Sequence, residues 1–215
     1  MKEKASPSKT LARRPVRPRA VQTHEIRIIG GQWKRIKLKV ADKPGLRPTP
    51  DRVRETLFNW LGQDLTGWRC LDAFAGTGAL GFEAASRGAA EVVLVEKDSA
   101  LVTQLQQVRS QLLALKPLEP TAVPVLVVNR GEGVAALRQA APVSLNLIFL
   151  DPPFDAPLFE PGLAACARAL KPDGVVYLEA PLQWSDEQLA PMGLAVQRHL
   201  KAGAVHAHLL KLASA

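Results

Sequence analysis

The chain has 215 residues, 47% of them hydrophobic, which is enough to bury one substantial core. Its formal net charge is +8. No apolar run is long enough to cross a bilayer, and the first twenty residues carry Arg and Pro where a secretory signal needs an apolar stretch. These features exclude a membrane protein or a secreted one, so we expect a cytoplasmic protein with no membrane partner.

The basic charge is concentrated at the N-terminus. Residues 1–54 hold 16 Lys and Arg against 4 Asp and Glu, a net of +12, and residues 55–215 carry a net of −4. A basic segment beside an acidic body favours binding of a polyanion. For residues 1–20 alone, a solubilising tail is an equal alternative.

The two cysteines, Cys70 and Cys166, each sit in an apolar segment without a CxxC partner. Buried thiols are therefore favoured over a disulfide or a zinc site. His206 and His208 are two residues apart on one face of a predicted strand, but no third ligand is near them in the sequence. We therefore expect no metal.

The N-terminal part divides into an arm and a hairpin. Residues 1–21 are rich in Lys, Arg and Pro without hydrophobic periodicity, which predicts a disordered basic arm. Residues 22–48 show two short strands about Gly30-Gly31, which predicts a basic β-hairpin. A larger α/β domain is expected over residues 49–215. It begins with a helix for which Thr49 is the candidate N-cap and Pro50 the first helical residue.

Strand and helix patterns alternate through the larger domain. Strands are predicted at residues 70–74, 91–96, 123–128, 145–150 and 175–179, and helices at 80–87, 100–115, 134–139, 158–170 and 185–190. A turn is expected at residues 171–174, and residues 194–200 and 205–212 form a final antiparallel hairpin. A mostly parallel seven-stranded sheet that ends in such a hairpin is typical of the Rossmann-like class I methyltransferase fold.

A glycine-rich loop follows the first strand of this domain. The stretch Asp72–Gly81 contains GxGxxG, and Glu96 ends the next strand where a ribose-binding acid belongs. This pattern alone predicts an adenosine-containing cofactor. Asp72 would repel a pyrophosphate but would hold the ammonium of S-adenosylmethionine, directly or through water, which favours that cofactor over NAD. The alternative is that Asp72 only ties the loop to its neighbours.

The motif Asp151-Pro152-Pro153-Phe154 directly follows a buried strand. At the carboxyl end of a strand it lies beside the crevice where ligands bind in α/β sheets. Asp151 and the Pro152 carbonyl would accept hydrogen bonds from an exocyclic amine and aim its lone pair at a methyl group, while Phe154 stacks on the base. The alternative is a tight turn with Phe154 in the core.

Four segments together resemble the RsmD-type bacterial 16S ribosomal RNA (guanine-N2)-methyltransferases. They are residues 26–33, residues 46–61 with the RPTxDRVRE pattern, the 72–81 loop and the 151–154 motif. The resemblance implies methylation of N2 of guanine 966, within the small ribosomal subunit or an assembly intermediate, by a monomer that converts S-adenosylmethionine to S-adenosylhomocysteine. It also implies that the basic hairpin and the cluster of Arg47, Arg52 and Arg54 bind RNA phosphates.

The expected site residues fall into three groups. The catalytic group is Asp151, Pro152, Pro153 and Phe154. The cofactor group is Asp72, Phe74, Gly76, Thr77, Gly78, Glu96, Lys97, Asn129, Gly131 and Glu132. The RNA-binding group is Arg27, Trp33, Lys34, Arg35, Lys37, Arg47, Arg52 and Arg54.

Two of these assignments carry alternatives. Family members often place Asp or Asn where this chain has Gly131, so the adenine contact falls to Asn129, Glu132 or backbone groups. Trp33 is the other case, because a half-buried strand aromatic packs on a core more often than it stacks on RNA.

Three other functions fit parts of the sequence. A DNA or RNA adenine-N6 or cytosine-N4 methyltransferase would use the same 151–154 motif, but nothing resembles a separate target-recognition domain. A catalytically silent RNA-binding assembly factor would keep the fold, although this motif is intact. A nicotinamide dehydrogenase would give no reason for the Asp-Pro-Pro-Phe sequence.

Overall fold

A computed structural model describes residues 24–40, 49–115 and 123–213 of the chain. The predicted arm at residues 1–21 and the candidate RNA contact Arg47 lie outside the described residues. Among the helices described, none is long and apolar enough to span a membrane.

The described elements follow the predicted order closely. The strands are β1 (His24–Arg27), β2 (Lys37–Val40), β3 (Arg69–Asp72), β4 (Glu91–Glu96), β5 (Val125–Arg130), β6 (Leu145–Leu150), β7 (Leu170–Ala180), β8 (Leu194–Ala202) and β9 (Val205–Leu212). The helices are α1 (Asp51–Leu61), α2 (Ala79–Ser86), α3 (Ser99–Leu113), α4 (Gly133–Gln139), α5 (Phe159–Ala169), α6 (Asp186–Leu189) and a 3₁₀ turn, η1 (Ala190–Met192).

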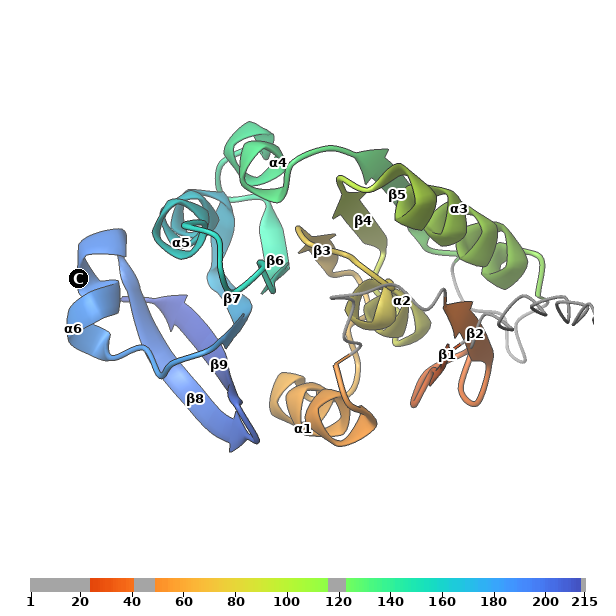
Figure 1. The fold of residues 1–215 in the computed structure, drawn as a ribbon, viewed down its shortest axis with the longest axis horizontal. Coiled ribbons are helices and arrows are strands. Elements are labelled where there is room, and N and C mark those ends of the chain that lie inside the picture. Colours follow the sequence, from red (N-terminus) through yellow and green to blue (C-terminus); the bar gives the residue numbers. More distant parts are fainter. Residues whose placement is uncertain (1–23, 41–48, 116–122, 214–215) are drawn as a thin grey trace, which may run out of the picture.

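Seven strands form one sheet in the order β5-β4-β3-β6-β7-β9-β8 (Figure 1). The first five of these pair in parallel, and β9 is antiparallel to both β7 and β8. The strand order reverses between β3 and β6, which places the carboxyl ends of those strands beside a topological switch point. The predicted Rossmann-like class I methyltransferase fold with a terminal antiparallel hairpin is confirmed.

Helices cover both faces of the sheet because its strands are apolar on both sides. Helices α1, α2 and α3 pack on one face, where their core includes Leu57, Phe82 and Leu105. Helices α4, α5 and α6 pack on the other, around Leu163 and Cys166. Both cysteines are buried free thiols, as predicted.

The N-terminal hairpin joins the first of these cores. Strands β1 and β2 pair antiparallel, and Ile28, Trp33 and Leu38 are buried in the same cluster as Leu57. The connection between the strands lies against α2, where Gly31 has a φ of +72° and a Cβ atom on it would lie 1.8 Å from the carbonyl oxygen of Ser86. The prediction that Trp33 binds RNA is wrong: the side chain is 4% exposed and packs as core, as its alternative held.

A buried carboxylate, Glu83 of α2, fixes the hairpin in place. Its two oxygens accept hydrogen bonds at 2.8 Å from the backbone N–H groups of Ile29 and Gly30. They also pair with Arg87 at 2.8 Å and Arg54 at 3.4 Å. Arg54 is therefore 1% exposed, and the prediction that it binds RNA phosphate is wrong because its charge is used inside the protein.

Two local predictions differ from the structure. Residues 171–174 are not a separate turn, because β7 begins at Leu170 and continues through them. The pairing of β6 with β7 changes register there, between Leu145 and Leu147 of β6. Thr49 does not cap α1, since Pro50 has an extended ψ of 147° and occupies the N-cap position. The Thr49 side chain instead lines the cavity and faces Glu179 of β7, where it lowers the pKa of that carboxyl.

We expect the Glu83→Gln variant to lose about 3–5 kcal/mol of unfolding free energy, because Arg54 and Arg87 would keep their burial and lose their shared anion. Chemical denaturation monitored by circular dichroism measures this. The exposed Glu187→Gln variant on α6 is the matched control and should behave as wild type. A Glu83→Gln variant as stable as this control would contradict the assignment.

Candidate active site

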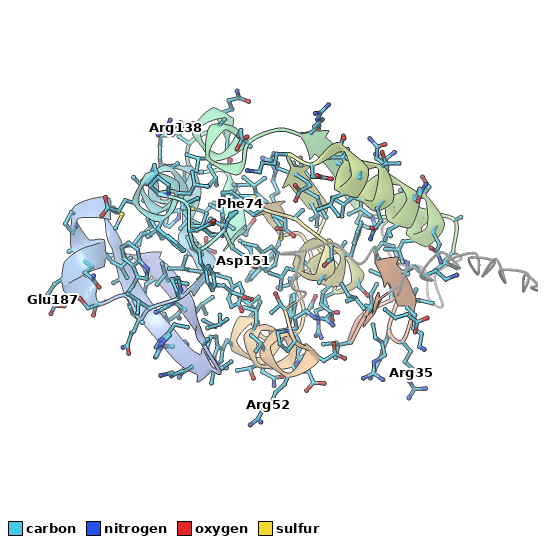
Figure 2. The ribbon with its side chains drawn as sticks, viewed as in Figure 1. Arg35, Arg52, Phe74, Arg138, Asp151 and Glu187 are labelled. Carbon is cyan, nitrogen blue, oxygen red and sulfur yellow. The ribbon has the colours of Figure 1, made fainter. Side chains whose placement is uncertain are left out.

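A cavity of about 510 Å³ lies at the carboxyl ends of the central strands. Figure 2 shows two of its lining residues, Phe74 and Asp151, near the centre of the molecule, between the two helical layers. Its lining residues are Thr49, Asp72, Ala73, Phe74, Ala75, Gly76, Thr77, Ala79, Leu80, Val95, Glu96, Lys97, Gly131, Glu132, Gly133, Asp151, Pro152, Pro153, Phe154, Asp155, Glu179 and Val205. Ligands of α/β proteins bind at this edge of the sheet.

The cavity brings together most of the residues that the sequence nominated. All four residues of the 151–154 motif line it, as do eight of the ten expected cofactor residues. Gly78 and Asn129 do not line it. Gly78 packs behind the loop, where a Cβ atom would lie 2.4 Å from the Phe82 ring, and Asn129 is exposed on β5.

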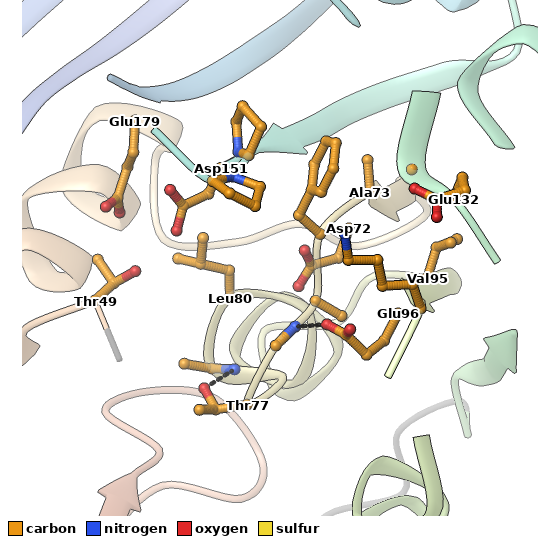
Figure 3. Close-up of a pocket in the computed structure, with 18 of the residues that line it drawn as sticks. Thr49, Asp72, Ala73, Thr77, Leu80, Val95, Glu96, Glu132, Asp151 and Glu179 are labelled. Carbon is orange, nitrogen blue, oxygen red and sulfur yellow. Dashed lines mark hydrogen bonds between the residues drawn. The ribbon is translucent and has the colours of Figure 1, made fainter. Parts of the chain in front are cut away.

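The glycine-rich loop is held by the strands on either side of it. Ala75 donates a backbone hydrogen bond to the Val95 carbonyl, and Gly76, with a φ of +51°, donates one to Glu96 Oε2 at 2.9 Å (Figure 3). Glu96 Oε1 accepts from the N–H of Asp98. Each carboxylate oxygen keeps a second lone pair, so Glu96 can still accept hydrogen bonds from a diol in the cavity.

Asp72 is buried in the middle of the cavity wall, with 3% exposure. Its Oδ2 accepts from the N–H of Gly81 at 3.1 Å, so it does tie the loop to the start of α2. Burial, together with the negative charges of Glu96 and Glu179, raises the pKa of Asp72 to about 7, against the hydrogen bonds from the backbone.

Asp151 and Glu179 lie side by side at one end of the cavity (Figure 3). Leu150, the last residue of β6, pairs with Leu178 of β7, so Asp151 just after β6 and Glu179 on β7 are neighbours. Burial raises the pKa of both carboxyls, and the charge of Glu179 raises that of Asp151 further. Tyr177 donates its hydroxyl to Glu179 Oε1 at 2.8 Å.

Sequence reasoning missed Glu179 and misassigned Thr49, and both line the cavity. Glu179 closed a predicted strand and received no role there. The available signal was its place as an acid at the carboxyl end of the strand that follows the 151–154 motif.

Phe154 is 41% exposed at the mouth of the cavity, so the alternative that placed it in the core is excluded. Its ring centroid lies 6.4 Å from that of Phe159, which in turn lies 6.2 Å from that of Trp184. Phe154 is thus supported from behind by an aromatic contact while it remains available to a planar ligand.

The cavity is strongly acidic. Among its lining residues are six carboxylates, and Lys97 is the one basic residue. Among the described residues, no group of three or more His, Cys, Asp or Glu side chains is arranged to hold a metal ion. Such a cavity suits a ligand with positive charge and disfavours a pyrophosphate.

Candidate RNA contacts are exposed around the hairpin and α1. Arg27, Lys34, Arg35, Lys37 and Arg52 all have exposed side chains. Arg27 is paired with Asp51 at 3.4 Å and Lys37 with Glu25 at 2.7 Å. Arg35 and Arg52 point outward on the same side of the molecule, opposite Arg138 (Figure 2).

A seven-stranded sheet with this order, a glycine-rich loop after β3 and an Asp-Pro-Pro-Phe motif after β6 define a class I methyltransferase. The family model described as "Conserved hypothetical protein 95" matches residues 26–211. The chain therefore belongs to this family, the RsmD-type methyltransferases.

Known relatives agree with this assignment. "Ribosomal RNA small subunit methyltransferase D" of Escherichia coli K12 is 42% identical over 183 residues, which cover 84% of this chain and 87% of the relative. The protein of the same name from Haemophilus influenzae is 39% identical over 72% of this chain and 78% of its own length. The solved structure of yhhF from Escherichia coli is 37% identical, with a TM-score of 0.72 over 89% of this chain and 100% of that one.

The raised pKa of Asp72 predicts a pH-dependent stability. Between pH 4 and 7 the folded protein keeps a proton on Asp72 that the unfolded chain has released, so stability falls as the pH rises through this window and is constant above it. The contribution is roughly 4 kcal/mol at most. We expect Asp72→Asn, which keeps an acceptor for the Gly81 N–H, to lose less unfolding free energy than wild type between pH 5 and 8 in urea titrations. Equal losses of unfolding free energy in the two proteins would contradict the raised pKa of Asp72.

Proposed function

We propose that this chain transfers a methyl group from S-adenosylmethionine to the exocyclic N2 of a guanine in 16S ribosomal RNA, guanine 966 by family resemblance. The observation that carries the proposal is the placement of Asp151 beside the glycine-rich loop in one acidic cavity. Membership of the RsmD-type family and the names of the relatives support a ribosomal RNA substrate.

The residues of the cavity fit S-adenosylmethionine. Its sulfonium and ammonium give it a net positive charge, which complements the carboxylates of the lining. Glu96 would hold the ribose hydroxyls, Asp72 the ammonium side, and Glu132 with the backbone at Gly131 the adenine. The cofactor supplies an electrophilic methyl group.

Asp151 would activate the amine. The N2 lone pair of guanine is delocalised into the ring, so the amine is a poor nucleophile. Hydrogen bonds from its two N–H groups to Asp151 and to the Pro152 carbonyl favour a pyramidal nitrogen and stabilise the positive charge that develops there. The raised pKa of Asp151 then suits it to accept the proton that the nitrogen releases.

Phe154 and the exposed arginines would position the RNA. The half-exposed ring of Phe154 is at the mouth of the cavity, where a base taken out of its stack would lie against it. Arg35 and Arg52 present positive charge on one side of the molecule, and the start of α1 adjoins the cavity through Thr49.

The proposal is tested by incubating the protein with labelled S-adenosylmethionine and, separately, small ribosomal subunits, naked 16S RNA and duplex DNA, and mapping any methylated base. We expect N2-methylguanine in the ribosomal RNA. We expect Asp151→Asn to lower kcat by roughly 10²- to 10³-fold, because the amide keeps an acceptor oxygen but loses the negative charge that stabilises the developing charge on nitrogen. Label found in DNA alone, or undiminished activity of Asp151→Asn, would overturn the proposal.

The RNA surface is tested by salt dependence. We expect Arg35→Ala and Arg52→Ala each to weaken RNA binding and to reduce the slope of log affinity against log salt by about 1, since each removes one phosphate contact. Arg138→Ala is the matched control, because this exposed arginine of α4 lies on the opposite side. Equal slopes in all three variants would show that the basic side of the hairpin and α1 is not the RNA surface.

A further inference from the structure

Glu179 occupies a place in the cavity that binding of the cofactor does not explain. It lies at the end of the cavity beside Asp151 and Thr49, away from Glu96 and Glu132 (Figure 3). The residue is 6% exposed and lines the cavity wall. A carboxylate at this end therefore faces the same space that the reacting amine would enter.

The surroundings of Glu179 hold it as a hydrogen-bond acceptor. Tyr177 donates to its Oε1 at 2.8 Å, and the Thr49 side chain faces the same carboxylate and lowers its pKa. Among the described residues, Tyr177 is the hydrogen-bond donor to Glu179, and no Lys, Arg or His side chain forms an ion pair with it. Burying a carboxylate without a cation is unfavourable unless further donors reach it, so the arrangement is completed by a ligand that brings an N–H group.

Guanine brings a donor of that kind. Its Watson–Crick edge carries N1–H directly beside the N2 amine, whereas adenine and cytosine present an unprotonated ring nitrogen beside their amines. Asp151 directly follows β6 and Glu179 lies on the adjacent β7, whose backbone is about 4.8 Å from that of β6, so their carboxylates can contact neighbouring groups of one base edge. A carboxylate would attract N1–H and repel a ring nitrogen lone pair.

We propose that Glu179 is the residue that selects guanine, by accepting a hydrogen bond from N1–H while Asp151 holds the N2 amine. The assignment rests on the proposed guanine-N2 activity and adds to it the reason for the choice of base. Tyr177 and Thr49 are positioning residues that orient the Glu179 carboxylate.

The test uses 2-aminopurine, which keeps the 2-amino group but has a lone pair at N1 in place of N1–H. The target guanosine is replaced by 2-aminopurine riboside in a ligated 16S RNA, which is reconstituted into small subunits. We expect wild type to prefer guanine by at least about 10²-fold in kcat/KM, because a site built to bind a donor rejects an analogue without it.

The Glu179→Gln variant should change this preference. The amide can donate to N1 of 2-aminopurine, so we expect the guanine to 2-aminopurine ratio of kcat/KM to fall at least about 10²-fold. A purely structural role would lower both values equally and leave the ratio unchanged, which would overturn the assignment. Tyr177→Phe should lower kcat/KM for guanine while retaining most of the preference, because the carboxylate remains.

Two controls distinguish failure of the Glu179 assignment from failure of the proposed function. Binding of labelled S-adenosylmethionine should be equal in wild type and Glu179→Gln, and Glu187→Gln, an exposed glutamate of α6 outside the cavity, should keep the wild-type ratio. If wild type does not methylate N2 of guanine in RNA, the proposed function fails. If it does but accepts 2-aminopurine equally well, only the role of Glu179 fails, and this result does not depend on any variant folding.

Discussion

Glu83 has no exposed surface, and donors from the hairpin, from α1 and from its own helix converge on it. Burying a carboxylate without partners costs free energy, so the charge of Glu83 favours the arrangement in which all of these donors surround it. The same helix begins at Ala79, and its N-cap Gly78 belongs to the glycine-rich loop beside the cavity. The position of α2 therefore fixes both the glycine-rich loop and the basic hairpin.

Local patterns were sufficient for most of the fold. The strands at residues 145–150 and 205–212 were predicted with the bounds that the structure has, because apolar runs between turn residues leave little ambiguity. The stretch 171–174 was misread, since Pro and Gly signal a turn locally while the pairing of β7 with Leu145 is a long-range property. Burial of Trp33 and Arg54 likewise depends on α2, which lies far along the chain.

The site was predictable where its residues are contiguous. The 72–81 loop and the 151–154 motif each carry a local signature, and both line the cavity. Thr49 and Glu179 come from separate elements, and only the register of β6 against β7 and the start of α1 bring them together. Residues that meet only in the folded structure have no fixed spacing in the sequence, so no motif identifies them.

The contacts between the hairpin and α2 also set an order for events during synthesis. Strand β1 leaves the ribosome early, yet the acceptor for the Ile29 N–H is Glu83, 54 residues further on. The hairpin alone is too small to bury its apolar side, and two-stranded hairpins are marginal in water. The nascent N-terminal segment must therefore remain undocked until α2 has been translated, so a strongly basic stretch is exposed before the cavity of the folded protein exists.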